Sequence, residues 1–182
     1  MDIKATDIKT LREKTGAGMM DCKKALTEAQ GDMAGAEKVL REWGMAGVEK
    51  RAGRATNEGK IFIKEGPWKI CVVESPWETD FVCGNKDFIA VGDKAVALAF
   101  DKGYDKPNDE LEGMVKDIAG IIKENMALKR VKLVTAGPNE YLHAYVHGES
   151  TLAVIVKVRS DSLAAFANDT VKAFVHDVAL HI

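Results

Sequence analysis

A chain of 182 residues, 46% hydrophobic and 30% charged, is long enough to bury a sizeable core, in one medium domain or in a small module joined to a larger one. Its formal net charge of −2 argues against broad binding to nucleic acid or to a membrane surface. No apolar run approaches the roughly 20 residues of a membrane span, and no signal peptide opens the sequence. We therefore expect a soluble, cytoplasmic protein with no membrane partner and no direct nucleic-acid partner.

Motifs of enzyme and cofactor chemistry are absent from the sequence. Cys22, Cys71 and Cys83 are odd in number and irregularly spaced, which predicts reduced thiols in place of a zinc site or a disulfide framework. No phosphate-binding Gly-x-x-x-x-Gly-Lys loop, Gly-x-Ser-x-Gly elbow or His-Glu-x-x-His helix occurs. A cysteine hydrolase built on Cys83 and His147 would lack an orienting signature. We expect no cofactor, no metal site and no enzymatic activity.

Residues 1–47 are predicted to form three short helices. A Gly-Ala-Gly stretch at 16–18 separates the first helix from the second, since glycine accepts the positive φ that ends a helix. In the third helix, apolar side chains recur at helical spacing between 33 and 43. Residues 48–59 lose this periodicity and are rich in charge, which predicts a linker or a solvated helix.

Residues 60–182 are predicted to form an α+β core domain, an antiparallel sheet with helices. Strands are expected at 60–65 and 68–75 around a Gly-Pro turn, and the second strand should be covered on both faces because it is apolar on both. The remaining predicted elements are a helix from about Lys86, a helix with Pro107 in its first turn, strands at 141–147 and 152–158, and a helical segment at 162–182 with Phe174 inward. Hairpin plus helix thus occurs twice, as in two related halves of one domain.

The most informative segment, residues 77–83, places an acid and an aromatic residue side by side directly after a predicted strand. Asp80 and Phe81 also have a purely structural interpretation, because a loop aspartate often caps a helix and a phenylalanine often folds back on the core. However, the chain resembles the elongation factor Ts family over nearly its whole length. The resemblance rests on Thr79-Asp80-Phe81-Val82, on Leu11-Arg12, and on Thr-Gly-Ala-Gly-Met-Met-Asp-Cys-Lys-Lys-Ala-Leu at 15–26.

The resemblance implies a guanine-nucleotide exchange factor that binds elongation factor Tu, in its GDP-bound and nucleotide-free forms, during translation elongation. In that family, the aspartate and phenylalanine matched by Asp80 and Phe81 intrude beside the magnesium site of the partner. Loss of the magnesium ion would remove much of the electrostatic hold on the β-phosphate of GDP. Thr79 and Val82 complete the matched exchange motif.

The resemblance implies further partner contacts in the N-terminal helices. The family places the segment that contains Met19, Met20, Lys23 and Lys24 against the nucleotide-binding domain of elongation factor Tu. Methionine side chains adapt well to such a surface, although one of the two could instead belong to the core. The lysines also have a plain interpretation as solvated residues on a helix face.

Two sites in the core domain also match the family. His147 lies in a Tyr-x-His-Gly pattern whose histidine contacts the partner near its phosphate-binding region. His143 shares the strand face of His147, but the pair has no third ligand nearby in sequence and predicts no metal site. Ile122 matches the usual Ile-Gly-Glu-Asn, whereas Lys123 stands where the family has glycine. We expect that glycine to allow a close approach of two backbones.

Some alternatives stay open from the sequence. Residues 1–47 also resemble ubiquitin-associated (UBA) domains, so a UBA-like peptide or nascent-chain binding protein without exchange activity would fit them. The apolar sheet leaves a homodimer open. The apolar helical pattern still runs at Ile182 without a capping signal, and members of the family usually continue beyond this helix, so we expect the C-terminal end to be truncated.

Overall fold

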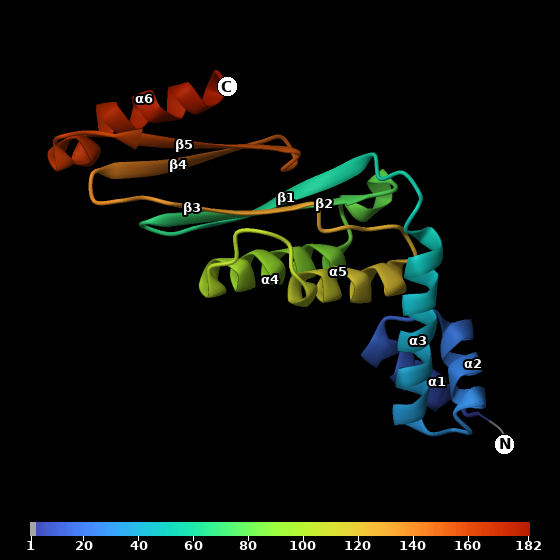
Figure 1. Cartoon of the computed structure of the whole chain (residues 1–182). Coiled ribbons are helices and arrows are strands. Elements are labelled where there is room, and N and C mark those ends of the chain that lie inside the picture. The colour runs from blue at the N-terminus through green and yellow to red at the C-terminus, as the bar shows by residue number, and fades with distance from the viewer. Residues whose placement is uncertain (1–2) are drawn as a thin grey trace.

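The computed structural model describes residues 3–182 and confirms the predicted α+β class, with a bundle of N-terminal helices followed by antiparallel sheets and further helices (Figure 1). The bundle consists of α1 (Ala5–Thr15), α2 (Met19–Glu28) and α3 (Met33–Arg51). Gly16 ends α1 in the left-handed region at a φ of 70°, as predicted. No helix in the described range has both the length and the apolar character needed to cross a membrane.

Helix α3 continues to Arg51, beyond the boundary predicted at residue 47. Residues 48–51 are therefore helical, one of the two alternatives that the sequence left open for this segment. Val48 is buried in the core beneath the main sheet, and the Arg51 guanidinium donates a hydrogen bond to the Ala119 carbonyl at 3.2 Å. Val48 is a single buried residue among charged ones, so it produces no apolar periodicity. The end of the helix was therefore predicted too early in the sequence. The division of the chain into domains itself stays a prediction.

Three antiparallel strands form the main sheet, in the order β1 (Glu58–Glu65), β2 (Lys69–Trp77) and β3 (Arg130–Thr135). Strand β3 is missing from the sequence-based prediction, although its apolar Val131 and Leu133 alternate with charged residues at the period of a half-buried strand. Strand β2 is thus the central strand and pairs with a neighbour on each side.

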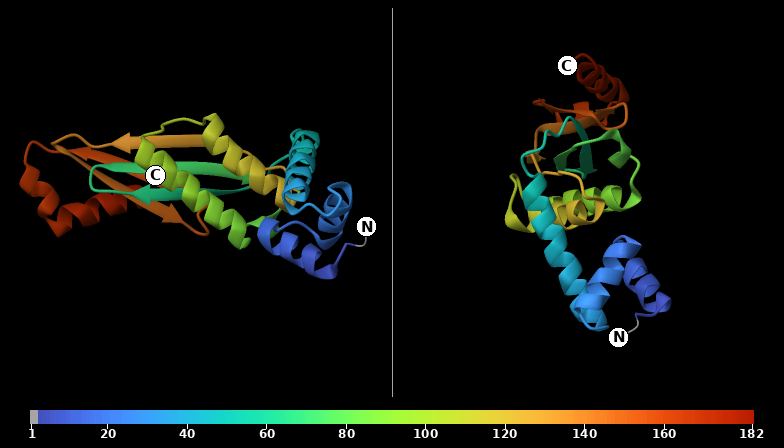
Figure 2. Two further views of the ribbon diagram at one scale, coloured as in Figure 1. Left: turned by 90° about the horizontal axis from the view of Figure 1, so that it is seen from below. Right: turned by 90° about the vertical axis from the view of Figure 1, so that its right-hand side faces the viewer.

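The layers of the core domain follow from Figures 1 and 2. Helices α4 (Lys86–Lys102) and α5 (Asp109–Ile122) cover one face of the main sheet. The hairpin of β4 (Glu140–His147) and β5 (Leu152–Arg159) lies on the other face, with α6 (Asp169–Leu180) outside it. Both faces of β2 are therefore covered, as its apolar sequence predicted.

Two predicted helices begin at other residues than expected. Pro107 lies before α5, whose cap is Asn108, because the Asn108 side chain accepts a hydrogen bond from the Leu111 amide at 3.1 Å. The last predicted helix is divided into a 3-10 helix (Leu163–Ala167) and α6, and Asn168 caps α6 through the Thr170 amide at 2.8 Å. In both places an asparagine sets the start of the helix.

The inward orientation predicted for Phe174 is wrong, because this side chain lies on the outer side of α6. Phe174 is 63% exposed, whereas Val175 and Ala179 are buried against β4 and β5. These two residues are four apart and therefore share one side of the helix. The correction follows from packing: small and β-branched side chains fit close to the hairpin, and the larger ring of Phe174 faces solvent.

The main core lies between the sheet and helices α4 and α5. Its centre is an aromatic group in which Phe88 packs edge-on against Trp77, with ring centroids 4.5 Å apart, and against Phe62, with centroids 5.6 Å apart. Gly92 faces Phe62, and a Cβ atom at that position would overlap the ring. Helix α4 therefore approaches the sheet closely because it carries a glycine there.

Helix α3 crosses α5 where two glycines meet and so fixes the bundle against the core domain. A Cβ atom on Gly120 would lie 3.1 Å from the Cα atom of Gly44, which is tighter than an ordinary contact, so a side chain at Gly120 would push the two helices apart. Beside this crossing, Arg41 pairs with Asp117 at 3.6 Å. The bundle is thus held to α5 by backbone proximity and by ionic contacts at its edge.

Candidate functional site

The segment between β2 and α4 projects an aromatic side chain into solvent. A 3-10 helix (Asp80–Val82) turns the chain there, and Phe81 is 87% exposed, the highest value among the large hydrophobic side chains in the described part of the chain. Asp80 is exposed beside it. We call Asp80 and Phe81 the tip. Val82 is only 2% exposed and joins the main core, so it supports the tip from beneath and does not present a surface of its own.

The tip is supported by buried structure on both sides. Trp77, which ends β2, is buried against Phe88 in the first turn of α4. The Asn85 side chain caps α4 by accepting hydrogen bonds from the amides of Asp87 and Phe88, at 3.0 and 3.1 Å. A lone exposed apolar residue is ordinary on protein surfaces. Here it differs from the ordinary case because the chain on each side of it is anchored.

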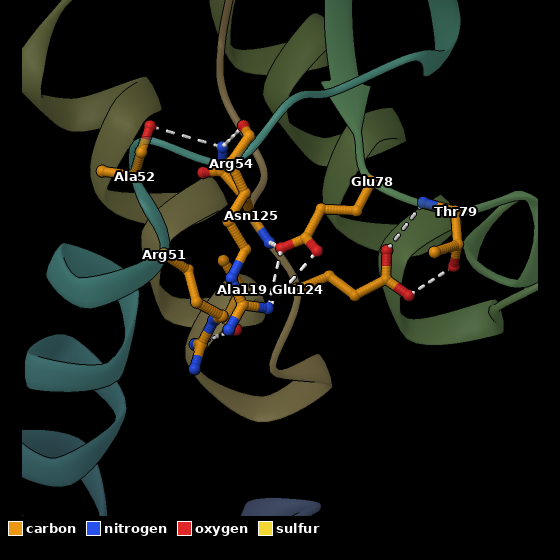
Figure 3. Close-up of polar contacts among 8 residues, drawn as sticks. All are labelled: Arg51, Ala52, Arg54, Glu78, Thr79, Ala119, Glu124 and Asn125. Atoms are coloured by element: carbon orange, nitrogen blue, oxygen red, sulfur yellow. Dashed lines mark hydrogen bonds and ion pairs between the residues drawn. The ribbon is translucent and has the colours of Figure 1, made fainter.

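The residue before the tip is held by a different part of the chain. The amide and the hydroxyl group of Thr79 both donate to the Glu124 carboxylate, at 3.1 and 2.6 Å (Figure 3). Residues 123–129 connect α5 to β3, so the tip and the end of α5 are neighbours in space. The structure therefore brings together the sequence motifs at 79–82 and 122–125. The sequence contained no signal for the hydrogen bonds between them.

All four candidate residues of α2 lie on its outer surface. Met19 and Met20 are 44% and 65% exposed, so neither belongs to the bundle core, and Lys23 and Lys24 are exposed as well. The expectation that one methionine could be a core residue is wrong, because Cys22 and Leu26 occupy the inward face of α2. The first turns of α2 thus present an apolar and basic surface.

Ile122 and Lys123 have separate roles at the end of α5. Ile122 is partly buried and packs against the main core. Lys123 caps the helix in the left-handed region, with a φ of 67°, and its ammonium group pairs with Asp21 of α2 at 2.5 Å. This left-handed conformation favours glycine, so it is itself a reason for glycine to suit this position. Residues 122–124 lie between the start of α2 and the tip.

Replacing Lys123 tests the conformational explanation. Lys123→Gly and Lys123→Ala both remove the ion pair to Asp21, but only glycine removes the steric cost of the left-handed region. We expect the glycine variant to be more stable than the alanine variant by about 1 kcal/mol. Urea unfolding of the two variants measures this difference. Equal midpoints with equal slopes would show that the left-handed conformation carries no cost at this position.

His147 lies at the exposed end of β4, with its Nδ1 atom 2.7 Å from the Tyr145 hydroxyl group. The turn that follows it contacts the start of the main sheet: the Lys60 ammonium group donates to the Glu149 carbonyl at 3.3 Å, and Lys60 pairs with Ser75 near the end of β2. The turn therefore points toward the end of the sheet from which the tip projects (Figure 1). His147 and the tip lie toward the same end of the core domain.

His143 joins β4 to α6 through a contact with a second histidine. Its Nε2 atom lies 3.0 Å from Nδ1 of His176, a distance at which one ring donates and the other accepts a hydrogen bond. Within residues 3–182, no group of three or more His, Cys, Asp or Glu side chains is arranged to hold a metal ion. We therefore interpret the pair as a contact between the hairpin and α6.

This contact predicts a pH dependence of stability. Burial, reinforced by His176, holds the pKa of His143 below its ordinary value, although Glu65 acts in the opposite direction. The folded chain therefore binds a proton at His143 less readily than the unfolded chain, so stability is lost as the pH falls from above the unfolded pKa through the folded one. We expect the unfolding midpoint to fall between about pH 7.5 and about pH 5.5, and to fall less in His143→Gln. Parallel curves for both proteins would contradict this.

Comparison with known proteins shows which family the chain belongs to. A family model described as Elongation factor TS matches residues 78–182. Proteins named elongation factor Ts match all of this chain: that of Treponema denticola is 48% identical over 181 residues, and that of Treponema pallidum (strain Nichols) is 42% identical over 192 residues. The chain covers 65% and 66% of the lengths of these two relatives. The protein of Aquifex aeolicus is 36% identical over 201 residues, with 67% of its length covered.

These matches group the chain with proteins that are named elongation factors. It belongs to the elongation factor Ts family. The matched range of the family model begins at Glu78 and includes the tip, and the relatives extend the similarity through the N-terminal helices. The chain spans slightly less than two thirds of the length of the Treponema relatives that it matches.

Proposed function

We propose that this chain is a guanine-nucleotide exchange factor, not an enzyme, that binds elongation factor Tu in the cytoplasm and promotes release of GDP during translation elongation. The observation that carries the proposal is the tip, an exposed carboxylate and an 87% exposed aromatic ring on a buried base. Membership of the elongation factor Ts family supports the choice of partner. The proposal assigns the tip to the partner's magnesium site.

The proposed mechanism acts on the support of the partner's magnesium ion. Magnesium requires near-ideal octahedral geometry and keeps several ordered water molecules, so small displacements around it weaken its binding. The ring of Phe81 displaces groups that support the ion, and the Asp80 carboxylate competes for the water molecules and cations around the phosphates. GDP then loses the charge that neutralises its β-phosphate and dissociates faster.

A second contact supplies binding energy away from the tip. The exposed residues of α2, Met19, Met20, Lys23 and Lys24, contact the nucleotide-binding domain of the partner, and His147 contacts the phosphate side. Linkage requires that GDP weaken binding of the factor as much as the factor weakens binding of GDP. A change of about 10⁴ in affinity corresponds to about 5.5 kcal/mol of differential binding, which needs a broad interface and not one hydrogen bond.

Peptide binding without exchange activity is a second candidate, supported by a cleft. A cavity of about 580 Å³ lies between the bundle and α5, and its lining includes the partly exposed Trp43, Met45 and Ile121. Clefts of this size with apolar walls accommodate small ligands or single side chains. A UBA-like peptide or nascent-chain binding protein would use this cleft and would leave GDP release unchanged.

Release of a fluorescent GDP analogue from purified elongation factor Tu separates these functions. Catalytic amounts of the chain, with excess unlabelled GDP, should accelerate release. Acceleration establishes the exchange function, whereas binding of the partner without acceleration contradicts it. Absence of both, together with binding of unfolded peptides that Trp43→Ala abolishes, would favour the second candidate. A homodimer stays a prediction, and sedimentation of the purified chain would decide it.

A further inference from the structure

Two consecutive residues between α5 and β3 hold the base of the tip. The Glu124 carboxylate accepts both hydrogen bonds that Thr79 donates, one from its amide and one from its hydroxyl group (Figure 3). The Asn125 amide donates to the Glu78 carboxylate at 2.5 Å. Each of the two residues that precede the tip therefore has its own partner in the connection between α5 and β3.

The tip has little support of its own. Its 3-10 helix is three residues long, and short 3-10 helices with few internal hydrogen bonds do not hold their geometry alone. The two amide hydrogen bonds inside it are long, 3.3 Å from Val82 to the Thr79 carbonyl and 3.2 Å from Cys83 to the Asp80 carbonyl. Thr79 occupies the N-cap position, yet its hydroxyl group does not cap this helix and binds Glu124 instead. The direction in which the chain enters Asp80 is thus set by Glu124.

The same connection also holds the segment that leaves the N-terminal bundle. The Asn125 side-chain amide donates to the Arg54 carbonyl at 2.7 Å and to the Ala52 carbonyl at 3.4 Å, and Asn125 is only 9% exposed. The Arg54 guanidinium pairs with the Glu78 carboxylate at 3.4 Å. In Figure 3 the two carbonyl groups meet the Asn125 side chain, whereas the Arg54 guanidinium and the Asn125 backbone amide meet the Glu78 carboxylate. This arrangement keeps Glu124 itself in place, because the next residue, Asn125, is held by three hydrogen bonds.

We propose that Glu124 is a positioning residue for exchange: by fixing Thr79, it keeps the tip in the orientation that disturbs the partner's magnesium site. This inference rests on the proposed function. A tip that is already ordered loses less conformational entropy when it inserts than a tip that must first be ordered. Glu124 should therefore affect the rate of exchange in the complex more than the formation of the complex, because the α2 surface binds independently of the tip.

Amide hydrogen exchange of the chain alone tests the positioning directly. In Glu124→Ala, hydrogen exchange at the amides of Thr79, Val82 and Cys83 should be about tenfold faster than in the parent. A loss of about 1.4 kcal/mol in the free energy of local opening produces this factor. Glu124→Gln should restore most of the protection, because its amide group can accept from the Thr79 amide and donate to the Thr79 oxygen. Unchanged protection in Glu124→Ala would overturn the proposal, whether or not the chain accelerates GDP release.

GDP release measures the functional consequence. Glu124→Ala should lower the maximal exchange rate about tenfold, with a small change in the concentration of factor that gives half the maximal rate, and Glu124→Gln should recover most of the rate. Glu112→Ala is the matched control, because it removes a partly exposed glutamate of α5 whose ion pair, within residues 3–182, is with Lys116 at 3.1 Å. A fall of equal size in Glu112→Ala, or a loss of affinity at unchanged maximal rate, would contradict a positioning role.

Thr79→Val tests the same contact from its other end with little change in shape. The substitution removes the hydroxyl group that donates to Glu124 and keeps the amide. If the two residues act together, Glu124→Ala should slow GDP release less in the Thr79→Val background than in the parent, because only the hydrogen bond from the residue 79 amide is then left to lose. Independent, multiplicative effects would overturn the proposal. A parent chain that fails to accelerate release would refute the proposed function alone, because the hydrogen-exchange result would still decide whether Glu124 orders the tip.

Discussion

Phe81→Ala is expected to slow GDP release from elongation factor Tu by roughly tenfold to a hundredfold, the loss caused by removing a binding hot spot of about 2 kcal/mol. The ring is 87% exposed in the free chain, so its removal takes nothing from the core. The folding stability should therefore stay within about 0.5 kcal/mol of the parent. Stopped-flow release of labelled GDP measures the first effect, and urea unfolding measures the second.

A second exposed phenylalanine provides the control for this prediction. Phe174 is 63% exposed on the outer side of α6, so Phe174→Ala makes the same chemical change far from the tip along the chain. It should leave the release rate within about twofold of the parent. Asp80→Ala should slow release as well, and by more than Lys24→Ala. Equal rates for Phe81→Ala and Phe174→Ala would remove the tip from the mechanism.

Short-range signals in the sequence predicted much of the fold correctly. Gly16 ends α1 as predicted, because the left-handed region after a helix favours glycine. The continuous apolar character of β2 predicted that both of its faces would be covered. These features depend on a few neighbouring residues. The motif at 79–82 was recognised by its resemblance to the family; Asp80 and Phe81 are exposed, and their role in exchange stays a prediction.

The features that the sequence did not reveal depend on contacts between distant segments. From the sequence, we expected the family glycine at position 123, which Lys123 replaces, to allow a close approach of two backbones. The structure has a close approach of two helices at Gly44 and Gly120 instead. The hydrogen bonds between Thr79 and Glu124 join residues that are 45 apart in sequence. The carboxylate of a glutamate after a helix has no periodic signal, so only the three-dimensional arrangement identifies its role. Strand β3, in contrast, had a visible alternation and could have been predicted.

Gly92→Ala should destabilise the chain, although alanine is the better helix former. Gly92 lies within α4 at the point where the helix meets Phe62, and a Cβ atom there would overlap the ring. Phe62 cannot move freely, because it is buried and packs edge-on against Phe88. Overpacking of this kind costs about 1–3 kcal/mol, whereas the gain in helix propensity returns at most about 1 kcal/mol. We expect a net loss of about 1–2 kcal/mol, and urea unfolding measures it.

Gly113→Ala is the matched control, because the same substitution in α5 meets no atom within 4 Å. It should raise stability by up to about 1 kcal/mol, so the two variants should differ in sign. Gly92→Ala should also slow GDP release at a temperature where it stays folded. Displacement of the Phe62 ring would also move Phe88, which packs against it. Phe88 in turn packs against Trp77, the last residue of the strand that leads to the tip. If Gly92→Ala proved as stable as Gly113→Ala, α4 would have to move away from the sheet at no cost. Its first turn, and with it the support of the tip, would then be far less rigid than the packing around Trp77 indicates.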